Sequence, residues 1–144
     1  MRFFFYGTLL DRDVMALVIG RRLPPQAYVA AGLPGHARRR AKNATYPIVV
    51  PARSGEVPGA VVGGLSHRDV ARLAAYEGPG YRIAPLRVKV QGRMTEVSVF
   101  EPIQTRLQPS QDLWDLTLWQ CRHKRSFVER LRRALSGRPA YSTP

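Results

Sequence analysis

The chain has 144 residues, of which 44% are hydrophobic, and this is enough for one compact domain with a sizeable core. The formal net charge of +13 predicts an attraction to anions, for which nucleic acid is the obvious candidate. The basic runs are interpreted first as ordinary solvated faces, and a surface that binds nucleic acid or another anionic ligand is the second choice. No apolar run is long enough to span a bilayer, and the single cysteine, Cys121, excludes an internal disulfide, so we expect a cytoplasmic protein without a membrane partner.

The start of the chain predicts a strand, a tight turn and a short helix. Residues 2–6 are mostly aromatic and favour a strand that ends at Gly7. Asp11 can cap the helix that follows, and Gly20 ends its apolar periodicity. A glycine turn in this position lets backbone N–H groups converge on an anionic group, although no glycine-rich nucleotide-binding motif is present.

The rest of the chain predicts five more strands and two more helices. The strands are expected over 27–33, 45–50, 57–65, 86–90 and 95–100, and the last two form a hairpin. Ser66 and Asp69 begin a helix over 66–75. Ser110 can cap a long final helix over 110–136, which has a basic polar face and carries Cys121 as a core residue. We expect an α+β, barrel-like fold in a single domain over 1–144, with a flexible tail over 136–144.

Glu77 is the first candidate for chemistry. It comes just after the periodic run over 66–75, at the end of the expected helix. Gly78, Pro79 and Gly80 follow at once, and they stop the helix and reverse the chain. Because a helix C-terminus carries partial negative charge, a carboxylate there is disfavoured, and if it is also desolvated its pKa should be raised. A raised pKa suits proton transfer near neutral pH. The alternative is a solvated glutamate that precedes a turn.

Four segments together resemble the γ-glutamylcyclotransferase family in the broad sense, including its AIG2-like and γ-glutamylamine-cyclotransferase branches. They are F-F-Y-G-T-L at 4–9, Y-P at 46–47, the glycine-rich strand over 57–65 and A-Y-E-G-P-G-Y at 75–81. The resemblance covers roughly residues 2–100 and implies a small mixed-sheet β-barrel with flanking helices. Many relatives have Y-x-R after the glutamate, whereas this chain has Ile83 at the third position and arginine only at Arg82.

The resemblance also implies the roles of individual residues. Glu77 matches the catalytic acid/base, and Tyr81 matches a tyrosine that lines the cavity. The loop that holds the γ-glutamyl group, largely through main-chain groups, matches Tyr6, Gly7, Thr8 and Leu9. Tyr46 is a further candidate contact, and packing in the core is the alternative for Tyr6 and Tyr46.

The implied reaction is a ring closure that needs no cofactor and no metal. The α-amino group of a γ-glutamyl amine or peptide attacks its own γ-carbonyl carbon, which forms 5-oxoproline and releases an amine. The three histidines, His36, His67 and His123, lack the spacing of metal ligands. The competing hypothesis is an inactive AIG2-like protein that binds a ligand in the same cavity and nucleic acid through its basic surface.

Overall fold

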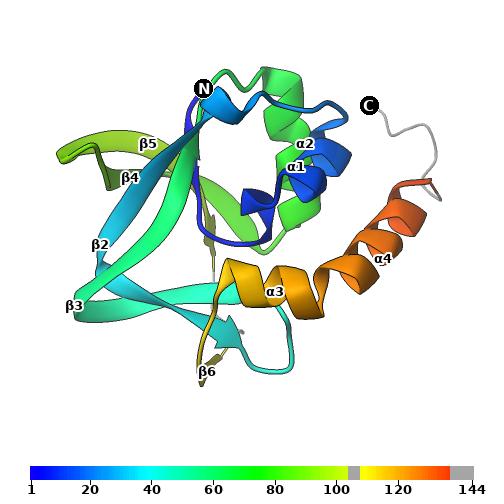
Figure 1. The fold of residues 1–144 in the computed structure, drawn as a ribbon. Helices are drawn as coiled ribbons and strands as arrows, with labels where there is room; N and C mark the ends of the chain where they lie inside the picture. The colour runs from blue at the N-terminus through cyan, green and yellow to red at the C-terminus, as the bar shows by residue number, and fades with distance from the viewer. Residues whose placement is uncertain (104–107, 137–144) are drawn as a thin grey trace.

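The computed structural model describes residues 1–103 and 108–136. Six strands form one mixed sheet in the order β3–β1–β5–β4–β2–β6, and an additional β3–β2 pairing closes five of them into a small barrel (Figure 1). Among the strand pairs of the described residues, only β1 and β5 run parallel. The strands are β1 (Phe3–Phe5), β2 (Tyr28–Ala41), β3 (Pro47–Val62), β4 (Tyr81–Val90), β5 (Arg93–Pro102) and β6 (Pro109–Leu113). The expected α+β class with a mixed-sheet barrel is confirmed.

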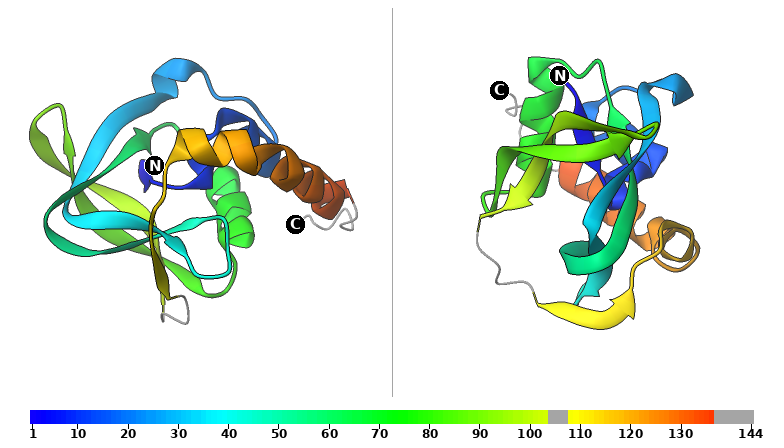
Figure 2. Two further views of the ribbon diagram at one scale, coloured as in Figure 1. Left: turned by 60° about the horizontal axis from the view of Figure 1, so that its bottom comes forward. Right: turned by 90° about the vertical axis from the view of Figure 1, so that its left-hand side faces the viewer.

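Helices cover the barrel from outside. Helices α1 (Arg12–Ile19) and α2 (His67–Glu77) lie side by side, and α3 (Leu116–Arg122) and α4 (Lys124–Ser136) continue in almost one line away from the barrel (Figure 2). Two short 3-10 helices, η1 (Thr8–Leu10) and η2 (Pro25–Ala27), connect the early elements. No helix among the described residues has the length and apolar character needed to cross a membrane.

Local capping explains why α1 and α2 begin and end where the sequence predicted. The Asp11 carboxylate accepts hydrogen bonds from the N–H groups of Asp13 and Val14, and Gly20 ends α1 in the left-handed region at φ 80°. At the start of α2, Ser66 and Asp69 form the reciprocal bonds of a capping box. These bonds satisfy N–H groups that a helix terminus otherwise leaves without partners.

Strands β2 and β3 are longer than the sequence predicted. The expected strand over 27–33 does not end at Pro34 but continues through the basic run to Ala41, and the expected strands over 45–50 and 57–65 are parts of one strand, β3. The register of the pair shifts between Pro34 and His36, and Gly35 has a φ of 75° there. The turn residues therefore produce a bulge inside a long hairpin rather than a strand end.

The predicted helix over 110–136 is wrong at its start and in its continuity. Ser110 lies in β6, which pairs with the outer edge of β2, and Asp115 caps the first helix of this segment by accepting from the N–H of Leu118. His123 then separates α3 from α4. Ser136 ends α4, and the rest of the expected tail, 137–144, lies outside the described residues. The apolar periodicity identified the helices but could not exclude a strand before them.

The core is built mainly from β1, α1 and the aromatic residues of the C-terminal segment. Phe3 and Phe5 pack in one cluster with Trp114 and Trp119, and Phe127 lies against the same cluster. Phe4, which points the other way from β1, belongs to a second cluster inside the barrel. Cys121 is exposed, so the expectation that it belongs to the core is wrong.

Candidate functional site

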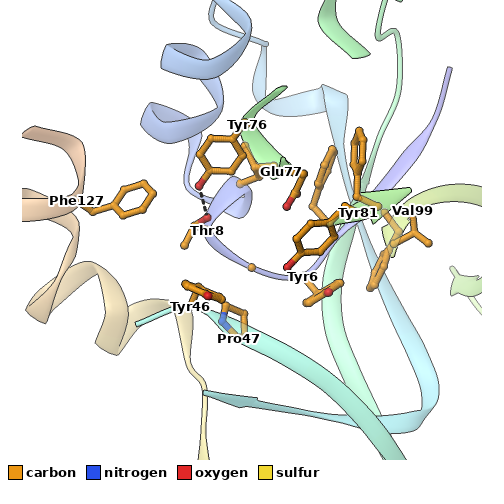
Figure 3. Close-up of a pocket in the computed structure, with 14 residues that line it drawn as sticks. Tyr6, Thr8, Tyr46, Pro47, Tyr76, Glu77, Tyr81, Val99 and Phe127 are labelled. Atoms are coloured by element: carbon orange, nitrogen blue, oxygen red, sulfur yellow. Dashed lines mark hydrogen bonds between the residues drawn. The ribbon is translucent and has the colours of Figure 1, made fainter. Parts of the chain in front are cut away.

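A cavity of about 370 Å³ lies where β1 ends, between the barrel and α2 (Figure 3). Seven residues were singled out from the sequence, and all of them line this cavity: Tyr6, Gly7, Thr8, Leu9, Tyr46, Glu77 and Tyr81. They come from three separate segments of the chain, 6–9, 46–47 and 75–81. The fold therefore brings together the segments that the sequence singled out, which makes the cavity the candidate site.

Gly7 allows two of these segments to approach each other. A Cβ atom at Gly7 would lie 3.1 Å from Cγ and 3.3 Å from Cδ of Pro47, which is closer than ordinary van der Waals contact. The φ of Gly7, −128°, lies outside the left-handed region that favours glycine, and the reason for a glycine that its contacts provide is one of space. Glycine is needed here because the first loop packs directly against the start of β3.

The loop after Gly7 offers main-chain donors to the cavity. The N–H groups of Leu10 and Asp11 bond to the carbonyls of Gly7 and Thr8. The N–H groups of Thr8 and Leu9, the first of η1, have no acceptor within residues 1–103 and 108–136. The Thr8 hydroxyl is joined to the Tyr76 hydroxyl at 2.8 Å, which ties this loop to the end of α2 (Figure 3).

Glu77 is the last residue of α2 and faces the cavity across from this loop (Figure 3). Its side chain is half-buried, and it forms no hydrogen bond or ion pair with any side chain in the described part of the chain. Burial raises the pKa of Glu77 from 4.5 to about 7. The raised pKa that the sequence predicted is thus present, and desolvation is its cause.

Three tyrosines surround Glu77 and stay protonated. Burial raises the pKa of Tyr76 and of Tyr81 to about 12, and burial also raises the pKa of Tyr6 far above its ordinary value. The negative charge of Glu77 adds to all three shifts. Near neutral pH these hydroxyls are therefore neutral hydrogen-bond donors, and only Glu77 can exchange a proton.

Arg38 and Trp114 support the site from behind, and no sequence pattern predicts this role. Arg38 lies in the run over 36–42, which suggested a basic surface, but its Nη1 donates to the carbonyls of Tyr6 at 2.9 Å and Pro58 at 3.1 Å. Its guanidinium lies 4.9 Å from the centre of the Trp114 ring, and Trp114 Nε1 donates to the carbonyl of Thr45 at 2.8 Å. The pair thus fixes the backbone next to both loops that meet at Gly7 and Pro47.

Phe127 of α4 completes the cavity wall and was also not predicted as a site residue. Its ring packs edge-on against Trp119, with 5.3 Å between ring centres. One turn earlier, Lys124 Nζ bonds to the carboxylates of Asp11 at 2.9 Å and Asp13 at 2.7 Å, which ties the start of α4 to α1. Burial alone would raise the pKa of Asp11, but hydrogen bonds from Lys124, Gln120 and the Val14 N–H lower it.

Arg82 and Ile83, the positions where this chain departs from its relatives, lie away from the cavity. Arg82 forms an ion pair with Glu101 at 2.7 Å, and both side chains are at least partly exposed. Ile83 is 49% exposed and lines a separate shallow groove beside Met1 and Arg2. Neither side chain contributes to the candidate site.

No metal-binding cluster of three or more His, Cys, Asp or Glu side chains occurs among residues 1–103 and 108–136. Glu77 is the one acidic residue among the described residues that line the cavity. The chemistry that these residues can perform on their own is the transfer of a proton by a carboxylate, beside neutral hydroxyl and main-chain donors.

Comparison with known proteins gives a consistent result. Residues 3–120 match the family model described as gamma-glutamyl cyclotransferase, AIG2-like. AIG2-like protein A of Arabidopsis thaliana is 29% identical over 135 residues, which cover 92% of this chain and 79% of that relative. The solution structure of an Arabidopsis thaliana protein aligns with a TM-score of 0.62 at 27% identity and covers 93% of this chain and 81% of that one. The structure of a gamma-glutamyl cyclotransferase aligns with a TM-score of 0.56 at 15% identity, covers 92% and 86% of the two chains, and shows a common fold.

Proposed function

Because the chain belongs to the gamma-glutamyl cyclotransferase, AIG2-like family, we propose that it is an enzyme that cyclises a γ-glutamyl amine or γ-glutamyl peptide. The products are 5-oxoproline and the free amine. The observation that carries the proposal is Glu77, a half-buried carboxylate without a charged partner in the described residues, whose pKa of about 7 suits proton transfer. It faces the Tyr6–Leu9 loop across a cavity of suitable size.

The reaction needs little more than positioning and one proton carrier. The α-amino nitrogen of the substrate attacks the γ-carbonyl carbon, and the bond from that carbon to the leaving nitrogen breaks. The attacking nitrogen loses two protons on going from an α-ammonium group to a lactam N–H. Glu77 takes them one after the other and delivers each to the leaving nitrogen, which departs as an ammonium group, so no proton is gained or lost overall. Since nucleophile and electrophile belong to one molecule, holding it in a folded conformation already provides a large effective concentration.

The remaining residues of the cavity hold the substrate in this conformation. The N–H groups of Thr8 and Leu9 bind the α-carboxylate of the γ-glutamyl group. The hydroxyl of Tyr6 or Tyr81 donates to the γ-carbonyl oxygen, where negative charge develops during the attack. The Tyr76 hydroxyl, already joined to Thr8, keeps the loop in place.

The direct test is the Glu77→Gln variant, assayed for 5-oxoproline release over a panel of γ-glutamyl amines and peptides. Loss of the proton carrier should lower kcat by about 10²–10⁴-fold. Glu129→Gln, the same change on the exposed face of α4, is the matched control and should retain activity. Full activity of Glu77→Gln would refute the role of Glu77. A wild-type protein that binds the panel compounds but cyclises none would favour the alternative, a ligand-binding protein without turnover.

A further inference from the structure

We propose that the leaving amine of the substrate carries an apolar or aromatic group and no carboxylate, and that Phe127 is a specificity-determining residue that selects it. This inference rests on the proposed function and adds the chemical class of the amine. It is carried by two features of the cavity wall, namely which charges it contains and which residue closes it.

Among the residues that the structure describes, no cationic side chain lines the cavity. Glu77 is the single charged residue of this described wall, and the other lining residues are aromatic, aliphatic or small. A carboxylate on the leaving group would lose its hydration shell without gaining a cation, and it would be repelled by ionised Glu77. The free N–H groups of Thr8 and Leu9 are already used by the α-carboxylate of the γ-glutamyl group. The described cavity therefore provides for one substrate carboxylate and not for two.

Three cationic side chains near Phe127 or the first loop are already engaged elsewhere in the described part of the chain. Lys124, one turn before Phe127, is bonded to Asp11 and Asp13. Arg38 donates to two backbone carbonyls behind the first loop. Arg130, one turn after Phe127, donates to Ser126 on its own helix at 2.9 Å. Recruiting Lys124 or Arg38 for a second carboxylate would break contacts that hold the site together.

Aromatic rings form most of the remaining wall, and Phe127 is the one that α4 supplies. It stands on the far side of Thr8 from Tyr6 and Tyr81, so the cavity is bordered by aromatic rings on opposite sides (Figure 3). Phe127 lies after residues 3–120, which match the family model, whereas Glu77 and the Tyr6–Leu9 loop lie within them. The proposed catalytic groups thus lie in the part of the chain that the family model matches, and Phe127 lies outside that part.

A matched pair of substrates tests the charge argument. N-γ-glutamylphenethylamine and γ-glutamylphenylalanine differ only in a carboxylate on the leaving group. We expect kcat/KM to be at least about 10²-fold higher for the phenethylamine compound, because an unpaired buried carboxylate is costly. Equal values, or a preference for γ-glutamylphenylalanine, would overturn the inference while leaving the proposed cyclotransferase activity intact.

Variants at α4 test the role of Phe127. Phe127→Ala should lower kcat/KM for the phenethylamine compound by about 10-fold, and far less for N-γ-glutamylmethylamine, which has no ring to pack. Phe127→Leu should recover part of the loss. Val128→Ala, at the neighbouring half-buried position outside the cavity wall, should not change the ratio between the two substrates. A loss that is equal for both substrates in Phe127→Ala would show a merely structural role and contradict the inference.

Binding separates failure of this inference from failure of the proposed function. If the wild-type protein cyclises none of these compounds, the proposed function fails, and calorimetric titration with the same matched pair still decides the selectivity. Tighter binding of N-γ-glutamylphenethylamine would support the inference. Equal affinity, stronger binding of γ-glutamylphenylalanine, or binding of neither compound would overturn it.

Discussion

The cavity wall is supplied by two regions that are held in place in different ways. Tyr6, Glu77 and Tyr81 come from residues 3–102, where strand pairing and a capping box fix the backbone. Phe127 comes from the C-terminal segment over 109–136, where β6 and the N–H of Trp114 bond to the backbone of β2 and the helices depend mainly on side-chain contacts. Those contacts are the Lys124 ion pairs, the hydrogen bond of Trp114 and the packing of Trp119.

This difference separates the two tasks of the proposed enzyme. A proton carrier must be held close to its working geometry, and the paired backbone of the first region provides that rigidity. A wall that selects the leaving amine tolerates more movement and can be altered by changing a few side chains of the second region. Variants in the first region should therefore change proton transfer and substrate alignment, whereas variants in the second region should change mainly local stability or the choice of leaving amine.

The largest expected effect is on the pH dependence of the free energy of unfolding, because ionising the desolvated Glu77 is costly. Its folded-state pKa is about 7, above the ordinary value of 4.5, so the folded protein binds more protons than the unfolded chain between these values. The free energy of unfolding should therefore fall as the pH rises from about 4.5 to above 7. At 1.36 kcal/mol per pKa unit, the loss is on the order of 3 kcal/mol as an upper value.

Glu77→Gln should remove this pH dependence. The variant and the wild-type protein should unfold at similar urea concentrations near pH 4.5, and the variant should be the more stable one at pH 8.5. Acidic groups with lowered pKa, such as Asp13 beside Lys124 and Arg22, are common to both proteins and cancel in the difference. If the difference between the two proteins does not grow with pH, Glu77 is solvated and the proton-transfer proposal loses its basis.

The next effect concerns the contact between the first loop and β3. Gly7→Ala places a Cβ 3.1 Å from Pro47 Cγ, so the loop or the proline must move. A displacement of a few tenths of an ångström to 1 Å should reduce kcat/KM by up to about 10²-fold, since the loop aligns the substrate with Glu77. Gly63→Ala is the control, because its Cβ would have only an ordinary contact at 3.8 Å, with Arg2. An active Gly7→Ala variant would mean that the loop does not position the substrate.

The residues that the sequence singled out in the first region line one cavity, and the signals that identified them are local. A capping pair, a glycine turn and alternating strand residues act within a few positions, and Glu77 is located by the Gly-Pro-Gly that follows it. The Gly7–Pro47 contact could only be recognised as a resemblance between separate motifs. Its physical reason, the lack of space for a Cβ, depends on the folded chain.

The second region was predicted poorly because its structure depends on distant partners. Ser110 and Asp115 are both of a residue type that favours the N-cap position. Residues 109–113 pair with the edge of β2 as a strand, so the helix can begin only after them, at Asp115. Arg38 belongs to a run of arginines, and no local pattern distinguishes the one that turns inward onto Trp114 from its neighbours. Phe127 has the spacing of any core residue, and its exposure to the cavity is a result of tertiary structure.

Arg38 provides the test of the link between the two regions. Arg38→Met would leave the Tyr6 and Pro58 carbonyls without this donor and remove the contact with Trp114, which should cost about 2 kcal/mol of stability. The buried Nε of Arg38 has no partner in the described residues, and its removal offsets part of this loss. Arg38→Lys should be less destabilising because it keeps a charged donor.

The matched control is Arg39→Met, in the same strand and the same basic run. Its side chain has no hydrogen bond within the part of the chain that the structure describes, so the change should alter the urea midpoint little. Arg38→Met should also lower kcat/KM, because Arg38 holds the carbonyl of Tyr6, the residue at which the substrate-binding loop begins. If both variants lose the same stability and activity, Arg38 is an ordinary member of a basic surface and the two regions are connected by other contacts.

The smallest expected effect is on the stability of α3, and it tests which residue caps the first helix of the second region. The Asp115 carboxylate accepts from the Leu118 N–H at 2.9 Å, so Asp115→Ala should destabilise α3 by about 1 kcal/mol and speed amide exchange over Leu116–Arg122. Ser110→Ala removes the hydroxyl that accepts from the Asp112 N–H, so exchange should change near β6 and not in α3. Faster exchange of the α3 amides in Ser110→Ala, with unchanged exchange of these amides in Asp115→Ala, would indicate one continuous helix that begins at Ser110. Such a helix would turn Phe127 relative to α1, and the aromatic wall opposite Tyr6 would lose its support.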